Sequence, residues 1–327
     1  MNRPPHELCP ETALAWHRGG MGAALATVIR SWGASPCPVG SQMAISGAGE
    51  IVGSVSGGCV EGAVVAEALA AMADGRLRVL DFGIADEDAF AAGLSCGGQV
   101  RILVDPVGEG ALTEAMLAAL VAARAAGRPL ALVTSLVDAH HALVGPGQDA
   151  SIDARLDAGR SGLENSDKFV AVHVPPPRLI LVGAVPIAQP LLAMARLCGF
   201  DGVLIDPRPA FASAARFPGE VILGDWPDSA LNSLAPDART AVVILTHDAK
   251  LDEPALVAAL ATRAFYIGCL GSSRTQDMRR QRLRALGQTE TTLARIHGPV
   301  GLQIGAESPG EIAASILADI IYCRNQK

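Results

Sequence analysis

The chain has 327 residues, half of them apolar and 18% charged, with a formal net charge of −7. The apolar content excludes a disordered chain, because burial of that much apolar surface offsets the entropy lost on ordering. The negative net charge excludes a broad basic surface for binding nucleic acid. Apolar runs are too short to span a bilayer, and residues 1–11 lack a signal-peptide core, so a cytoplasmic protein is expected. Seven cysteines without a CxxC pair predict reduced thiols rather than disulfides or a zinc site.

Local patterns in the first half predict a mixed domain of strands and helices. The expected helices are residues 11–17, 60–72 and 112–126, and the expected strands are residues 24–32, 41–45, 50–55, 77–82, 100–104, 130–136 and 169–174. A glycine turn at residues 47–49 predicts a hairpin, and residues 145–167 are expected to be loops and short pieces of secondary structure. The triple proline at residues 175–177 favours a stiff connector, which divides the chain into domains 1–174 and 175–327.

Strands and helices alternate in the second half. The expected strands are residues 179–182, 202–205, 241–245 and 264–268, and the expected helices are residues 187–197, 253–262, 273–286 and one that begins at Ser308. Ser308 and Glu311 have the spacing of a capping box around Pro309. Such alternation is typical of a parallel sheet covered on both faces, so the fold class is α/β, with a Rossmann-like doubly wound domain second.

A glycine-rich loop between a predicted strand and a predicted helix is the strongest candidate site in the first half. Glycines permit close approach of a ligand, serines add hydroxyl groups, and a helix start lowers the pKa of a thiol. This arrangement favours a thiolate that binds a soft metal, although a turn with a structural cysteine fits equally well. The candidate residues are Ser54, Ser56, Gly57, Gly58, Cys59 and Glu61.

A second loop repeats the pattern of serine and cysteine beside paired glycines. Its candidate residues are Ser95, Cys96, Gly97 and Gly98. Two such loops in one small domain favour a functional role, because thiols beside paired glycines are not a packing pattern. Cys37, flanked by prolines, is a third candidate. The structural cysteines are expected to be Cys9, Cys198, Cys269 and Cys323.

The second half contains an incomplete dinucleotide-binding motif. Gly183 follows the first predicted strand, but Val185 occupies the position where a second glycine would let pyrophosphate approach. Asp206, 23 residues after Gly183, fits either a ribose-binding carboxylate or a turn residue. The turn therefore disfavours NAD(P).

Two further candidate sites lie at predicted strand ends. One loop opens a predicted helix and combines hydroxyls, backbone amides and an arginine, which suits a phosphate; it comprises Gly271, Ser272, Ser273, Arg274 and Thr275. The arginines that follow on the helix are expected to lie mostly on a solvated face. His247 is either a ligand-facing donor or, more commonly for such a residue, a structural hydrogen-bonding group.

These motifs resemble those of the XdhC/CoxI family. The similar segments are residues 26–29, 47–49, 53–61 and 93–98 in the first half, and residues 246–247, 266–272 (YIGCLGS), 295–302 (RIHGPVGL) and 304–313 in the second. They occur in the family's order and span nearly the whole chain. One departure is Val185-Pro186, where family members generally have glycine and histidine.

The resemblance implies an N-terminal XdhC/CoxI-like domain and a non-catalytic carrier of molybdenum cofactor in its molybdopterin form. Such a carrier protects the cofactor during sulfuration and delivers it to an apo xanthine dehydrogenase-type hydroxylase. It implies that Cys59 and Cys96 contact molybdenum, which fits the soft character of a sulfur-ligated metal. Implied partners are that enzyme, a cysteine desulfurase or other sulfurating protein, and a second copy in a homodimer.

Three alternatives remain open at this level. The Rossmann-like domain is compatible with an NAD(P)-dependent oxidoreductase, although no acid–base group for hydride transfer is evident. A persulfide on Cys59 or Cys96 would make the protein a sulfur-transfer factor. A pure interaction module would dock the partner enzyme without holding cofactor.

Overall fold

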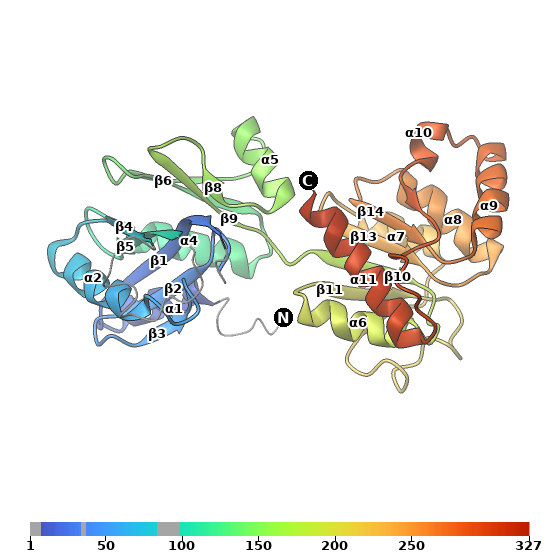
Figure 1. Ribbon diagram of the computed structural model, residues 1–327, viewed down its shortest axis with the longest axis horizontal. Coiled ribbons are helices and arrows are strands. Elements are labelled where there is room, and N and C mark those ends of the chain that lie inside the picture. The colour runs from blue at the N-terminus through green and yellow to red at the C-terminus, as the bar shows by residue number, and fades with distance from the viewer. Residues whose placement is uncertain (1–7, 34–36, 84–98, 327) are drawn as a thin grey trace. The chain divides into compact units, whose positions relative to one another are not determined.

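The computed structural model describes residues 8–33, 37–83 and 99–326. The chain divides into two compact units, Met1–Pro175 and Pro176–Lys327. Each unit has hydrophobic clusters of its own and is described separately (Figure 1). Among the described residues, no helix is both long and apolar enough to cross a membrane.

The first unit is built around an antiparallel sheet that, within the described residues, has the strand order β3-β2-β1-β5-β4. The strands are β1 (Ala23–Trp32), β2 (Gln42–Ser46), β3 (Ile51–Gly53), β4 (Arg78–Phe82) and β5 (Gln99–Pro106). Central β1 pairs with β2 and β5, with Ala24 opposite Ile45 and Pro106. Both faces of β1 are buried, which explains its continuous apolar sequence.

Helices cover the two faces of this sheet. Helix α2 (Glu61–Asp74) packs on the face that carries Ala24, Ala26 and Val28, whereas Leu25 and Ile29 face a cluster with α1 (Cys9–Arg18) and α4 (Glu114–Ala125). That cluster also includes Leu132 and Phe169 from a second antiparallel sheet. Its described strands have the order β7-β6-β9-β8 and are β6 (Leu130–Ser135), β7 (His141–Val144), β8 (Gly162–Leu163) and β9 (Lys168–His173).

The second unit has a parallel sheet with the strand order β12-β11-β10-β13-β14-β15 across described residues 176–326. The strands are β10 (Arg178–Val182), β11 (Asp201–Ile205), β12 (Val221–Leu223), β13 (Thr240–Ile244), β14 (Tyr266–Cys269) and β15 (Ile296–His297). The register places Val182 beside Ile205 on one side and Ile244 on the other. In sequence order this is the doubly wound order 3-2-1-4-5-6, which confirms the predicted fold class.

Alternate residues of these strands belong to two hydrophobic cores, one on each face of the sheet. Leu179, Leu181 and Val243 pack against α6 (Ala188–Leu197) and α11 (Pro309–Asn325) on one face. Ile180 and Val182 pack on the other face against α7 (Pro227–Leu234) and α8 (Ala249–Leu260). The helices of this unit are labelled in Figure 1. Burial on both faces explains why these strands are apolar runs without alternation.

Several elements differ from the sequence prediction. Residues 145–167, expected to be loops and short pieces of secondary structure, contain α5 (Ala150–Ala158), whose start is capped by the Asp149 carboxylate. Helix α8 begins four residues before the predicted start because Asp248 caps it, and Pro254 lies inside it. The prediction also omitted β7, β12, α7, α10 (Glu290–Leu293) and β15. The capping box of Ser308 and Glu311 is confirmed at the start of α11.

Candidate functional site

The loop that precedes α2 is organised around the carboxylate of Glu61. Oε1 accepts hydrogen bonds from the Ser54 hydroxyl at 2.6 Å and from the backbone N–H groups of Val55 at 3.2 Å and Ser56 at 2.9 Å. Oε2 accepts from the Ser56 hydroxyl and from the Gly58 N–H at 3.0 Å. Glu61, only 8% exposed, therefore holds the loop from inside.

The electrostatics of this loop follow from the same contacts. Burial by itself raises the pKa of Glu61, but the hydrogen bonds from Ser54 and Ser56 outweigh it and bring the pKa to about 2. The carboxylate is thus fully charged at neutral pH. Its charge is satisfied by the loop's own donors, so Glu61 maintains the loop conformation rather than presenting an acceptor to a ligand.

The outward part of this loop consists of Gly57, Gly58 and Cys59. Both glycines are exposed, with φ values of 79° and 112°, in the region that favours glycine. A Cβ atom on Gly58 would meet nothing within 4 Å, so space lies open above it. Cys59 is half-buried, and its N–H donates to Ser56 Oγ at 3.0 Å. The Cys37 thiol lies 3.9 Å from Ser54 Oγ in the same region.

The candidates Ser95, Cys96, Gly97 and Gly98 lie outside the described residues. Their contact with cofactor stays a prediction.

In the second unit, the turn after β10 lies close to the end of β13. Gly183 has φ 113°, and a Cβ atom there would lie 2.6 Å from Thr246 Cγ2 and 3.1 Å from its backbone nitrogen. The glycine is required by this close approach and by its backbone conformation. Val185 is half-buried and packs against the core shared with α6, so its side chain occupies the turn where a second glycine would leave room.

Asp206, predicted as a ribose ligand or a turn residue, is 1% exposed at the end of β11. Its Oδ2 accepts from the Ala184 N–H at 2.8 Å, and Arg208 donates to both carboxylate oxygens at 2.9 and 2.7 Å. Burial acts to raise the pKa of Asp206, but the Arg208 and Ala184 hydrogen bonds hold it below its usual range. The carboxylate ties the β10 turn to Arg208, which uses the oxygens that ribose hydroxyls would need.

The loop of residues 271–275 leads from β14 into α9 (Ser273–Ala285). Gly271 has φ 139°, and Ser272 caps the helix by accepting from the Thr275 N–H at 3.2 Å. Ser272, Ser273 and Arg274 are exposed, and Thr275 is half-buried. The tip therefore presents hydroxyls, a guanidinium and N–H groups of a first helical turn, which together suit an anion.

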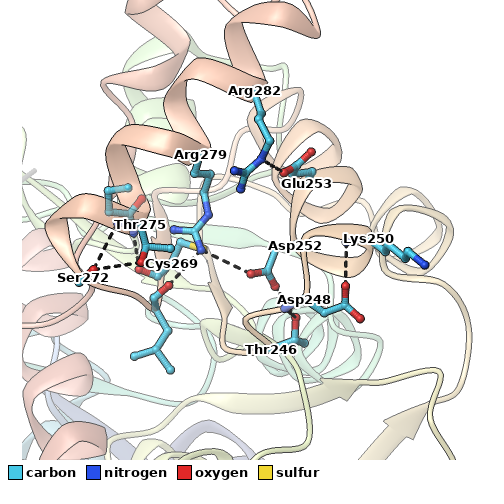
Figure 2. A network of polar contacts seen from close by, with 12 residues as sticks. Thr246, Asp248, Lys250, Asp252, Glu253, Cys269, Ser272, Thr275, Arg279 and Arg282 are labelled. Carbon is cyan, nitrogen blue, oxygen red and sulfur yellow. Dashed lines mark hydrogen bonds and ion pairs between the residues drawn. The ribbon is translucent and has the colours of Figure 1, made fainter.

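Arg279 was expected, with its neighbours on α9, to lie mostly on a solvated face, but it is 2% exposed. Figure 2 shows its guanidinium between Thr275 and Asp252, where Nη2 donates to the Leu270 carbonyl at 3.1 Å and contacts Asp252 at 3.4 Å. Nη1 is buried without a hydrogen-bond acceptor among the described residues and lies 3.8 Å from the Cβ position of Gly271. Arg279 thus adds a buried positive charge directly under the exposed loop.

The buried face of α9 was not recognisable from its residue types. Gln276, Arg279 and Leu283, three and four residues apart, are the buried residues of this helix. Gln276 also anchors the helix by donating to the Cys269 carbonyl at 2.9 Å. Leu283 is the only apolar residue on this buried face, and Met278 is exposed, so the residue types of α9 form no apolar stripe that would have placed Arg279 inside.

Asp252, opposite Arg279, is also buried and accepts a hydrogen bond from the Thr246 hydroxyl. Burial raises the pKa of Asp252 despite the contacts with Thr246 and Arg279. His247, a predicted candidate, follows Thr246 with a φ of 62° and is exposed. It therefore lies on the solvent side of this network. Burial raises the pKa of the Cys269 thiol to about 12, so that cysteine is not a thiolate.

The sequence is similar to known proteins in both units. Residues 179–320 match the family model of the XdhC Rossmann domain, and residues 16–83 match that of the XdhC and CoxI family. The chain is 30% identical over 305 residues to the molybdenum cofactor insertion chaperone PaoD of Escherichia coli (strain K12), a match that covers 93% of this chain and 84% of that protein.

Two further similarities extend over both units. The chain is also 27% identical over 322 residues to a protein of Bacillus subtilis (strain 168) named as a probable xanthine dehydrogenase subunit. This match covers 93% of this chain and 94% of the Bacillus subtilis protein. A crystal structure described as a xanthine dehydrogenase from Bacillus halodurans superposes with a TM-score of 0.73 and 26% identity, covering 97% and 96% of the two chains. The matches agree with the motifs in both halves, and the chain belongs to the XdhC and CoxI family.

Proposed function

We propose that this protein is a molybdenum cofactor chaperone that binds the cofactor in its molybdopterin form, protects it during sulfuration and delivers it to an apo xanthine dehydrogenase-type enzyme. The observation that carries the proposal is the 30% identity, over 93% of the chain, to a relative named as a molybdenum cofactor insertion chaperone. The name of the Bacillus subtilis relative supports the class of recipient enzyme.

The loop before α2 suits the metal end of such a cargo. Molybdenum with sulfur ligands is soft, and the half-buried thiol of Cys59 lies beside two exposed glycines that leave space above the loop. Glu61 and Ser56 fix the backbone of the loop without using the thiol. A single thiol contact also allows release, which a carrier requires. Cys96 is proposed as a second contact on the sequence pattern.

The loop before α9 suits the phosphate end. Ser272, Ser273 and Thr275 offer hydroxyls and helix N–H groups, Arg274 lies at the tip, and Arg279, paired with Asp252, has one buried guanidinium nitrogen without an acceptor among the described residues. Gly271 is required where it approaches Thr275 and Arg279. We propose that this loop, considered within the second unit alone, binds a phosphate group.

Gel filtration of the full chain with free cofactor tests binding. Molybdenum and pterin should coelute with the wild-type protein at about one equivalent, less with Cys59→Ala and less with Arg274→Ala. Cys198→Ala, which removes an exposed cysteine in the second unit, is the matched control and should bind as the wild type does. Coelution that is equal for all four proteins would remove the proposed contacts. Absence of coelution from the wild type would remove the chaperone function itself.

Delivery is tested separately with an apo xanthine dehydrogenase-type enzyme. Loaded protein should restore its activity faster than the same amount of free cofactor, and a cysteine desulfurase should increase the active fraction. Restoration that is no faster than with free cofactor would contradict delivery while leaving cofactor binding intact.

The alternative, an NAD(P)-dependent oxidoreductase, has the strand order of the second unit in its favour. The engaged carboxylate of Asp206 and the side chain of Val185 oppose nucleotide binding in the usual pose. Fluorescence titration with NADH and NADPH separates the two functions, since the chaperone proposal expects no saturable binding at micromolar concentrations.

A further inference from the structure

Three side chains with metal-ligating atoms meet in the second unit. They are His297 on β15 and Asp319 and Cys323 on α11. Their ligating atoms all lie within 4.8 Å of one another. We propose that this His297–Asp319–Cys323 cluster binds one divalent transition-metal ion, with zinc the best match. The site is independent of the proposed cofactor role.

The fold brings His297 to this point through the register of the sheet. Gly268 on β14 pairs with His297 on β15, and Tyr266 lies two residues earlier on the same face of β14. A Cβ atom on Gly268 would lie 2.7 Å from Tyr266 Cε1, so the missing side chain makes room for the tyrosine ring. That ring stacks on the His297 imidazole with centroids 4.4 Å apart. The imidazole is thereby held in one orientation.

The other two ligands come from one face of α11. Asp319 and Cys323 are four residues apart, which places them one above the other on a helix. Asp319 is 8% exposed and Cys323 half-buried. One carboxylate oxygen lies 3.6 Å from His297 Nδ1, and the other lies 3.8 Å from the Cys323 sulfur. The carboxylate thus lies between the two softer donors.

These separations are close to those of a tetrahedral zinc site. With bonds of about 2.0 Å to nitrogen and oxygen and about 2.3 Å to sulfur, neighbouring ligands of such a site lie roughly 3.3–3.7 Å apart. The observed 3.6 and 3.8 Å involve different oxygens of Asp319, and one ligand atom from each residue lies within 4.8 Å of the others, so side-chain rotations of the three residues have to close the remaining gap. Nitrogen, oxygen and thiol donors together suit zinc and not magnesium or calcium, which prefer oxygen alone. Three protein ligands leave a fourth position for water.

Tyr266 forms the kind of hydrogen bond to a ligating residue that is common around metal sites. Its hydroxyl donates to Asp319 Oδ2 at 2.6 Å within the core. Such a hydrogen bond orients a ligating carboxylate and adjusts its basicity. A tyrosine–carboxylate–imidazole network without metal would show the same contact, but it would give the thiol of Cys323 no essential part. The two interpretations therefore differ in what removal of that sulfur does.

The sequence prediction excluded a zinc site because no CxxC pair is present, and it took Cys323 as structural. The cluster escapes such a search because His297 and Asp319 are 22 residues apart and belong to a strand and a helix. Only the packing of α11 against β14, the strand that pairs with β15, brings them together.

Cobalt titration of the full-length, chelator-treated protein tests the site. One equivalent of Co²⁺ should produce a thiolate-to-cobalt charge-transfer band, and Zn²⁺ should displace it. Cys323→Ser should abolish the band, whereas Cys198→Ser, the control at an exposed cysteine, should keep it. Tyr266→Phe should weaken Co²⁺ binding by about 10- to 100-fold while the thiolate band persists at saturation.

His297→Gln provides a second route if Cys323→Ser does not fold. It removes a half-exposed imidazole and should lower the zinc content of the folded protein, measured by mass spectrometry, from about one per chain to near zero. A wild-type protein without a charge-transfer band, or a band that persists in folded Cys323→Ser, would overturn the proposal.

Discussion

Replacing Glu61 by glutamine tests whether its carboxylate organises the candidate loop in the first unit. The substitution keeps the shape of the side chain but exchanges one acceptor oxygen for an amide nitrogen that only donates. The Ser56 N–H points at one side of the group and the Gly58 N–H at the other. Either orientation of the amide therefore sets a donor against a donor.

The expected loss follows from the proton affinity of the buried carboxylate. The difference between the ordinary pKa of 4.5 and the value of about 2 corresponds to about 3 kcal/mol, since a tenfold change in proton affinity is worth about 1.4 kcal/mol. Because the folded-state pKa is depressed, this stabilisation is complete above about pH 4.5 and is lost as the pH falls towards 2. Glu61→Gln should therefore destabilise the first unit by about 3 kcal/mol at pH 7.

Urea unfolding followed by tryptophan fluorescence measures this loss. In a Trp226→Phe background the remaining tryptophans, Trp16 and Trp32, both lie in the first unit and report on it alone. The stability difference between the protein with Glu61 and the Glu61→Gln variant should shrink steadily between pH 4.5 and pH 2. The control is Glu67→Gln on the same helix α2. It removes a surface ion pair with Arg78 of β4 and should cost at most about 1 kcal/mol.

A Glu61→Gln variant as stable as the Glu67→Gln control at pH 7 would refute this reasoning. So would a stability difference that does not change between pH 5 and pH 2. In either case the loop would be held by backbone geometry, and the hydrogen bonds to the carboxylate would contribute little.

Three further substitutions test the second unit and the start of α2. Gly183→Ala should lower the stability of the second unit by at least about 2 kcal/mol in thermal unfolding, because its Cβ would lie 2.6 Å from Thr246 and its φ is 113°. Arg279→Leu should cost about 3–5 kcal/mol by leaving the Asp252 carboxylate buried and uncompensated, and Asp252→Asn in the same chain should recover part of the loss. Gly62→Ala, in the first turn of α2 with nothing within 4 Å, should raise stability by roughly 0.5 kcal/mol; a lowered melting temperature would contradict it.

The sequence predicted those parts of the fold that depend on neighbours within a few residues. The alternation of strands and helices established the doubly wound class, and Ser308 and Glu311 marked the start of α11 because a capping box is complete within four residues. The missed helix α5 also has a local signal, the Asp149 cap, which the polar composition around it obscured. Edge strand β15 is two residues long, too short for any periodicity.

Within the candidate loops, residue type did not reveal which side chains hold the loop and which face outward. The glycines and Cys59 do lie on the open part of their loop, but Glu61 and Ser56 are used inside it. Asp206 has the spacing of a ribose ligand, yet Arg208 and the Ala184 N–H occupy its oxygens. Hydrogen bonds across a turn depend on side-chain rotamers that spacing does not specify.

The sequence by itself determined the layers of the second domain and the positions of the glycine-rich loops, because backbone propensity, capping and apolar periodicity act over short distances. Only the tertiary structure decided which charges are buried and which distant side chains meet. Arg279 lies inside and Arg274 outside because α9 packs by one face, and His297 meets Asp319 because β15 pairs with β14, against which α11 packs. Such contacts depend on strand register and on packing between elements far apart in the chain, which local sequence patterns do not predict.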